Sequence, residues 1–358
     1  MDKHNTTYSQ TGNSIQSTGA LSTRPFTDTL ITDDEFFVLM TVFTVLNATL
    51  SMSGMVANTI NIVTFRKLDA RDNFLMCFLV LSSVDFLCSL SAFMQQVAMT
   101  FWILEIVSHN KIVFPIEPRA MSVVFANIRS CLINAPVLIT LYLSISKCLC
   151  VVKPLQFKKM FSFKRNAGIL MGICTFALVS YIPVYASTWV ISQYDQTVNA
   201  TRPILWLTPY RDVIRNVLWI IRDTFPSMAS EVIIIICVKF MSKALREAAK
   251  FRASLKQIIS ESSKGKAKKR VNNKSENTLS FSELQLMKQV IAVALIFIAG
   301  NTPKVFVFTA LAVVPDLNFG NRYQNLYLVL MASREVIENL ISAANFIVYY
   351  KYNSKYTK

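Results

Sequence analysis

The sequence predicts an all-α integral membrane protein, a seven-transmembrane helix bundle. Of its 358 residues, 53% are hydrophobic and only 16% are charged, whereas soluble proteins average about 45–50% and about 25%. Residues 36–65 and 166–194 contain no charged side chain. Because about 20 mostly apolar residues are enough to cross a bilayer as a helix, these runs exclude a soluble enzyme. We therefore expect no catalytic residue, metal or cofactor.

The apolar runs that meet this length criterion define the elements. The first and fourth runs carry no charge, and the second carries only Asp85. The third, fifth, sixth and seventh contain internal charges but are too apolar for solvated helices. Blocks such as Ile233–Ile236 lack the alternation of membrane-spanning strands. In order, the predicted spans are residues 36–65, 73–104, 121–152, 166–194, 216–243, 284–314 and 323–350.

The basic residues predict the orientation. Counting those at the inner ends of the spans, 24 Lys and Arg residues fall on one side of the membrane and eight on the other, and these residues accumulate on the cytoplasmic side. We therefore expect the amino-terminal tail (1–35) outside, the membrane domain over 36–351, and the short tail (352–358) inside. The net charge of +16 then reflects topology and attraction to anionic inner-leaflet lipid, and we expect no nucleic-acid partner.

The segment 244–282, between the fifth and sixth spans, is basic, rich in serine and poor in apolar residues. Such a composition cannot bury enough apolar surface to fold on its own, which predicts a disordered cytoplasmic loop. The flanking helices should continue for a short distance, over residues 243–250 and 283–288.

Two glycosylation sequons, at Asn5 and Asn199, fall on the predicted outer side. Both asparagines are therefore expected to carry glycans. All seven cysteines lie in or at the edge of spans, so we expect no disulfide between the outer loops.

Polar residues and prolines inside the spans carry the functional signal. Polar groups are costly in hydrocarbon and usually face the bundle interior. They could serve as interhelical hydrogen-bond partners in any bundle, and the prolines could be simple kinks. The residues concerned are Asn58, Asp85 and Asn345 in spans one, two and seven, Pro226 in span five, Phe297 and Pro303 in span six, and Tyr349 after Asn345.

Over residues 36–358 these positions resemble the motifs of rhodopsin-like (class A) G-protein-coupled receptors. The segments around Lys147 and Asn345 look most like the chemosensory and peptide receptors of molluscs and related invertebrates. The resemblance implies a plasma-membrane receptor that binds an extracellular ligand, either a peptide or a small chemosensory molecule. It also implies a signal to a heterotrimeric G protein through Lys147 and Pro154, with arrestin and a receptor kinase as further partners.

The chain departs from the family at several switch positions. Ser146, Lys147 and Cys148 stand where the family has an acid, an arginine and an aromatic residue, and lysine does not reproduce the planar guanidinium. Pro136 replaces a hydroxyl that helps to hold sodium in the family, so we expect no sodium site. The resemblance still implies a two-state bundle in which Pro226, Val137 and Phe297 repack and Lys147 becomes exposed to the G protein.

Charged residues in the outer halves of the spans form the candidate ligand site, and most of them match positions that line the family's ligand cavity. A desolvated charge needs a partner, and two arrangements are open. The charges pair with one another, or Arg129 and Lys304 bind an anionic group of the ligand. The candidate residues are Arg129, Arg222, Lys304, Glu335 and Glu338.

Two other classes of membrane protein are alternatives. A transporter should contain internal repeats, and we find none in the sequence. A seven-span ligand-gated channel of the insect odorant-receptor type would have its amino terminus inside, contrary to the distribution of basic residues.

Overall fold

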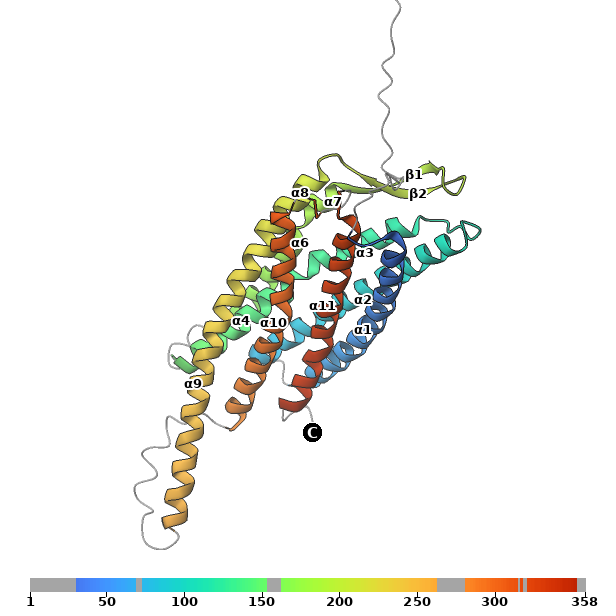
Figure 1. The fold of residues 1–358 in the computed structure, drawn as a ribbon. Helices are drawn as coiled ribbons and strands as arrows, with labels where there is room; N and C mark the ends of the chain where they lie inside the picture. The colour runs from blue at the N-terminus through green and yellow to red at the C-terminus, as the bar shows by residue number, and fades with distance from the viewer. Residues whose placement is uncertain are drawn as a thin grey trace, which may run out of the picture.

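The computed structural model describes residues 30–68, 73–152, 162–262, 281–314, 316–317 and 321–352. Long helices lie side by side in a bundle, and a two-stranded antiparallel hairpin lies at one end, called here the hairpin end (Figure 1). The elements are α1 (Asp33–Lys67), α2 (Asn73–Val107), α3 (Pro118–Leu132), α4 (Asn134–Val152), α6 (Phe163–Val179), α7 (Ile182–Ala186), β1 (Thr188–Asp195), β2 (Ala200–Leu207), α8 (Arg211–Leu218), the π-helix η1 (Trp219–Thr224), α9 (Phe225–Ser262), α10 (Phe281–Val313) and α11 (Gln324–Tyr352).

Within the described residues, five helices are long and apolar enough to cross a membrane. The prediction of a helical bundle with apolar spans is confirmed at this level. The helices α9 and α11, which cover most of the predicted fifth and seventh spans, are not among the five. The number of seven spans therefore stays a prediction. The five are Asp33–Lys67, Asn73–Val107, Pro118–Cys150, Phe163–Ala186 and Met287–Leu311.

Many large apolar side chains are exposed on the outside of the bundle, and many polar ones are buried within it. On α1, Val38, Val42 and Val45 are exposed, while Asn47 and Asn58 are buried. A helix on the surface of a soluble protein has the reverse distribution, whereas helices in lipid keep their polar groups toward the bundle interior. Together with the five long helices, this distribution indicates a membrane-associated protein.

The helix α1 begins slightly before the predicted span. Thr32 and Glu35 form a capping box, in which the Thr32 hydroxyl accepts from the Glu35 amide and the Glu35 carboxylate accepts from the Thr32 amide. Three acidic residues in the first turn and two basic residues in the last turn complement the helix dipole.

The predicted third span, 121–152, corresponds to one candidate span, Pro118–Cys150, which is interrupted at Ile133. The helix α3 ends at Leu132, and α4 begins at Asn134. Pro136 lies in the first turn of α4 and has no N–H to donate to the carbonyl of Leu132, four residues earlier. The interruption therefore has a local cause in the sequence.

The predicted fourth span, 166–194, is wrong at its carboxyl end. The helical part ends with α7 at Ala186, and the residues from Thr188 onward form β1, paired with β2 from Thr188↔Leu207 to Asp195↔Ala200. Pro183 has no N–H for the carbonyl of Val179, which helps to end α6. The aromatic and β-branched residues that follow favour a strand.

The predicted fifth span, 216–243, also differs from the structure. A π-helix, η1, lies between α8 and α9, and α9 continues to Ser262. The helix continuation expected over 243–250 extends further, to Ser262. The predicted disordered loop is therefore wrong over 251–262 and at 281–282, where α10 begins, and residues 263–280 lie outside the described part. Residues 243–262 are rich in Ala, Leu, Lys and Arg, which are strong helix formers, and an existing helix adds them without a new nucleation step.

The last two helices agree with the predicted spans 284–314 and 323–350 to within a few residues. Gly300 of α10 faces α11. A Cβ atom on Gly300 would lie 1.7 Å from Cδ1 of Ile341, so only glycine permits this approach.

Aromatic side chains fill the bundle toward the end opposite the hairpin. Tyr349 of α11 packs its ring edge-on against Phe65 of α1 and Phe78 of α2, with centroid distances of 5.4 and 5.1 Å. All three side chains are fully buried. This core leaves a space nearer the hairpin end, where polar residues gather.

Candidate functional site

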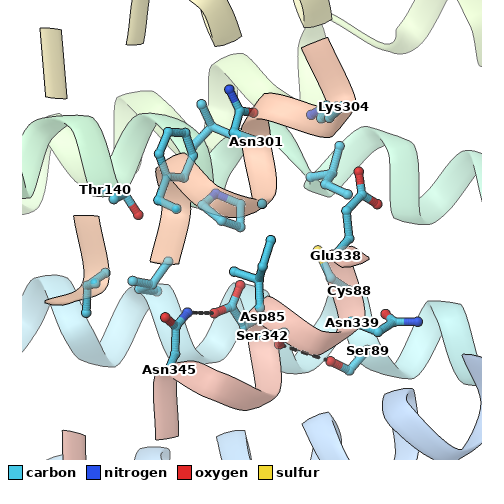
Figure 2. Close-up of a pocket in the computed structure, with 18 of the residues that line it drawn as sticks. Asp85, Cys88, Ser89, Thr140, Asn301, Lys304, Glu338, Asn339, Ser342 and Asn345 are labelled. Atoms are coloured by element: carbon cyan, nitrogen blue, oxygen red, sulfur yellow. Dashed lines mark hydrogen bonds between the residues drawn. The ribbon is translucent and has the colours of Figure 1, made fainter. Parts of the chain in front are cut away.

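A cavity of about 90 Å³ lies inside the bundle between α2, α3, α4, α10 and α11. Figure 2 shows Asn301 and Lys304 on one side of it and Asp85 and Asn345 on the other. The side chains that line it are Leu81, Asp85, Cys88, Ser89, Arg129, Ile133, Pro136, Val137, Thr140, Val293, Phe297, Asn301, Lys304, Glu338, Asn339, Ile341, Ser342 and Asn345, and the backbone of Gly300 completes the wall.

The polar residues that sequence analysis singled out in spans one, two and seven converge on one side of this cavity. The amide of Asn345 donates to the Asp85 carboxylate at 3.2 Å, and Asn58 donates to the Ser342 hydroxyl at 3.0 Å. Ser342 in turn lies 3.4 Å from the hydroxyl of Ser89. These contacts join α1, α2 and α11 in one buried network.

Arg129 lines the cavity from α3 and is neutralised by α11. Its guanidinium lies 3.1 Å from the Glu335 carboxylate and 2.8 Å from that of Glu338. Gln95 also donates to Glu335, at 3.1 Å, and Arg334 lies 3.4 Å from Glu338. Of the two arrangements considered from the sequence, mutual pairing is the one found for Arg129.

Lys304 lines the same cavity from α10 but has a different environment. Its side chain is only 4% exposed. Within the described residues, it has neither a hydrogen bond nor an ion pair. Its ammonium lies 5.8 Å from the centroid of the Phe308 ring, which is a weak contact. The cavity is therefore lined by one paired cation and one cation without a carboxylate.

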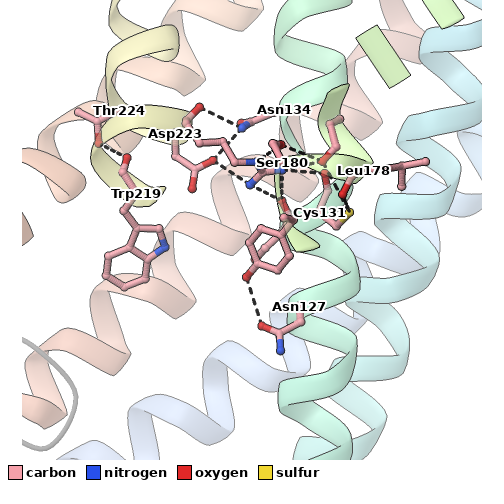
Figure 3. A network of polar contacts seen from close by, with 12 residues as sticks. Asn127, Cys131, Asn134, Leu178, Ser180, Trp219, Asp223 and Thr224 are labelled. Carbon is pink, nitrogen blue, oxygen red and sulfur yellow. Dashed lines mark hydrogen bonds and ion pairs between the residues drawn. The ribbon is translucent and has the colours of Figure 1, made fainter. Parts of the chain in front are cut away.

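Arg222 does not line the cavity. Arg222 and Asp223 of the π-helix η1 are both buried. Figure 3 shows Asp223 beside Asn134, Cys131 and Ser180, near the ends of α3 and α6. The Arg222 guanidinium donates to the carbonyls of Ser130 and Cys131, at 3.1 and 2.8 Å, and to the Ser180 hydroxyl at 2.8 Å. It also pairs with Asp223 at 3.2 Å.

Asn134, at the start of α4, completes this network. Its amide donates to the Asp223 carboxylate at 2.8 Å and to the carbonyl of Arg222 at 3.1 Å. That carbonyl lacks its helical partner because Pro226 has no N–H. The fifth-span proline of the sequence analysis thus leaves a free acceptor, and a neighbouring helix supplies the donor.

The predicted switch residues lie around the cavity and around the buried network of Arg222. Val137 and Phe297 line the cavity, and Pro303 lies inside α10, directly before Lys304. Lys147, expected to contact a G protein, is buried, with its ammonium 3.9 Å from the centroid of the Phe74 ring. Pro154 lies outside the described residues.

The hairpin is anchored by charges that sequence analysis did not single out. The Arg202 guanidinium of β2 lies 2.6 Å from Glu105 at the end of α2 and 2.8 Å from Asp195 of β1. Burial by itself would raise the pKa of Asp195, but hydrogen bonds from Thr197 and Arg202 outweigh it and hold that pKa below its usual value. Asn199 lies exposed in the hairpin turn with a positive φ of 53°, and Asn5 lies outside the described residues.

No protein-family model matches this chain, and no curated protein is significantly similar to it. Within the described residues, no group of three or more His, Cys, Asp or Glu side chains could hold a metal ion. The function of the chain is therefore inferred from the helix bundle, the cavity and the charged residues around the cavity.

Proposed function

We propose that this chain is a seven-span receptor of the rhodopsin-like type in the plasma membrane. Its hairpin end faces outward, an extracellular ligand binds in the central cavity, and the opposite end signals to a heterotrimeric G protein. The observation that carries the proposal is the cavity itself, because a buried space with a few convergent polar groups is the usual form of a small-molecule site.

The two helices that were not counted as apolar spans are the fifth and seventh of this receptor. Their outward faces suit lipid: Phe225, Val232 and Phe240 of α9 are exposed, as are Leu340 and Ile347 of α11. In the part of each helix that would lie in the membrane, Glu231 of α9 and Arg334, Glu335 and Glu338 of α11 have polar partners inside the bundle. A span of this kind is apolar toward lipid although its mean composition is not.

Signalling requires two states of the bundle that bind the ligand with different affinities. The cavity lies beside the break between α3 and α4 at Ile133 and near Pro303, which is inside the continuous helix α10, and the π-helix η1 precedes Pro226. Such irregularities are common at functional sites. In our proposal, repacking of Val137 and Phe297 around the ligand moves the inner part of α10 and exposes Lys147.

The test is basal nucleotide exchange on purified heterotrimeric G proteins, with the full-length chain reconstituted in lipid nanodiscs. The wild type should accelerate exchange, and Lys147→Ala should reduce it to the level of empty nanodiscs, because the cation that meets the G protein is lost. Lys67→Ala, an exposed lysine at the end of α1, is the matched control. Equal activity of wild type and Lys147→Ala, or no exchange with any G protein, would contradict the proposal and favour a channel or transporter.

A further inference from the structure

We propose that Lys304 anchors the carboxylate of a small organic acid in the central cavity. This inference rests on the proposed function and names the class of ligand that the cavity binds. It depends on three features of the described residues: an unpaired buried cation, the neutralisation of the neighbouring arginine, and the size and lining of the space.

The environment of Lys304 is incomplete in the described structure. An ammonium group has three donors, and removing it from water without an acceptor is costly. Only 4% of Lys304 is exposed, and its ammonium lies 5.8 Å from the centroid of the Phe308 ring. The Glu338 and Asp223 carboxylates attract it through space, but within the described residues neither forms an ion pair or a hydrogen bond with it. An anion in the adjoining cavity would supply the missing acceptor.

Arg129 is not the anchor, although it lines the same cavity. It already lies within 3.1 Å of two carboxylates, Glu335 and Glu338. A ligand anion would have to compete with both of them. Lys304 also lines the cavity. Within the described residues it is in no ion pair, and Glu338 and Asp223 attract it only through space.

The cavity also limits the ligand. A volume of about 90 Å³ corresponds to about three waters at roughly 30 Å³ each, which fits a short-chain acid but not a peptide. Ile133, Val137 and Phe297 provide an apolar wall for an aliphatic chain. Asp85 and Glu338 line the same space. Carboxylates there repel any anion in proportion to its charge, so a single negative charge placed against Lys304 is favoured over a dianion such as hydrogen phosphate.

The experiment is equilibrium dialysis of radiolabelled butanoate against the full-length chain in nanodiscs, with empty nanodiscs as baseline. The wild type should bind butanoate, whereas butanamide and inorganic phosphate should not compete. Lys304→Met should weaken binding by at least about tenfold, the usual contribution of a hydrogen bond to a charged group. Lys304→Arg, which keeps the charge, should retain most of the affinity.

Lys111→Met, which removes an exposed lysine outside the bundle, is the matched control and should bind like the wild type. Butanoate should also raise the unfolding temperature of the wild type but not that of Lys304→Met. A rise of this kind reports binding to the folded protein only. Equal competition by butanamide, unchanged affinity in Lys304→Met, or a cavity that takes up water alone would overturn the inference. Because dialysis uses no G protein, failed coupling leaves this test intact, and failed binding leaves the coupling test intact.

Discussion

Arg222 and Lys304 are both basic residues buried near the hairpin end of the bundle, with 3% and 4% of their surfaces exposed. Arg222 has acceptors on every side: carbonyls of Ser130 and Cys131, the Ser180 hydroxyl and the Asp223 carboxylate. Lys304 has none within the described residues and faces a cavity instead.

The environments of Arg222 and Lys304 correspond to two different roles of a buried charged side chain. The acceptors of Arg222 come from three segments of the chain, so its guanidinium fixes α3, α6 and η1 relative to one another. The fold does not satisfy Lys304, and its desolvation lowers the stability of the empty protein. A residue of the second kind is expected where a ligand completes the site.

Arg222→Met should have the largest effect on stability. The change leaves the Asp223 carboxylate buried without its cation and several carbonyls without a donor, and breaking a buried pair in this way costs about 3–5 kcal/mol. The measurement is the unfolding temperature of the purified protein in detergent, with Arg66→Met, an exposed arginine at the end of α1, as control. A stability close to that of the wild type would remove the distinction between the two cations.

Lys304→Met should act in the opposite direction in the absence of ligand. Methionine fills a similar space without a charge to desolvate, so we expect the free energy of unfolding to stay the same or to rise by about 1 kcal/mol. The same thermal unfolding assay, in buffer without organic acids, gives the answer. A loss of stability comparable to that of Arg222→Met would mean that Lys304 has a structural partner in the fold.

The buried polar network could be predicted from the sequence, because each of its residues is a polar side chain within a single apolar span. A carboxylate or amide within an apolar run must turn toward the bundle interior, and Asp85 and Asn345 do so and meet at 3.2 Å. The same rule indicates that the five charged candidates are buried. It does not say which of them meet, because that depends on how the helices pack.

The partners of Arg222 could not be predicted from residue types. Most are backbone carbonyls near the ends of α3 and α6, which every sequence possesses. The π-helix that turns Arg222 inward has no sequence signature either, although Pro226 marks the carbonyl that it leaves free. The absence of a partner for Lys304 is equally a property of the packed bundle.

The hairpin was missed because an uncharged run does not distinguish a helix from a strand. Residues 188–194 continue the apolar character of the fourth span, and length alone placed them in the membrane. Pro183 and the β-branched pair Val190 and Ile191 were the available signals. Arg202, which anchors the hairpin, gave none, because its partner Glu105 is remote in sequence.

The Arg202 cluster offers a third and smaller test of what a paired charge contributes. The folded-state pKa of Asp195 lies below its usual value, so the contribution of this carboxylate is present above the unfolded-state pKa of about 3.9. It is lost as the pH falls through the lower, folded-state pKa. Because Asp195 is partly exposed, we expect the loss to be at most about 1 kcal/mol.

The measurement is limited proteolysis of the hairpin between neutral pH and pH 3, with an acid-tolerant protease. Cleavage of the wild type should increase at the acid end, whereas Asp195→Asn, which removes the titrating group, should be cut more readily at neutral pH and change less with acid. Arg202 keeps its charge throughout this range, so the change reports the carboxylates around it. A wild-type profile that is flat to pH 3 would mean that the pairing of Arg202 with Asp195 adds nothing measurable, and that Glu105 alone anchors the hairpin.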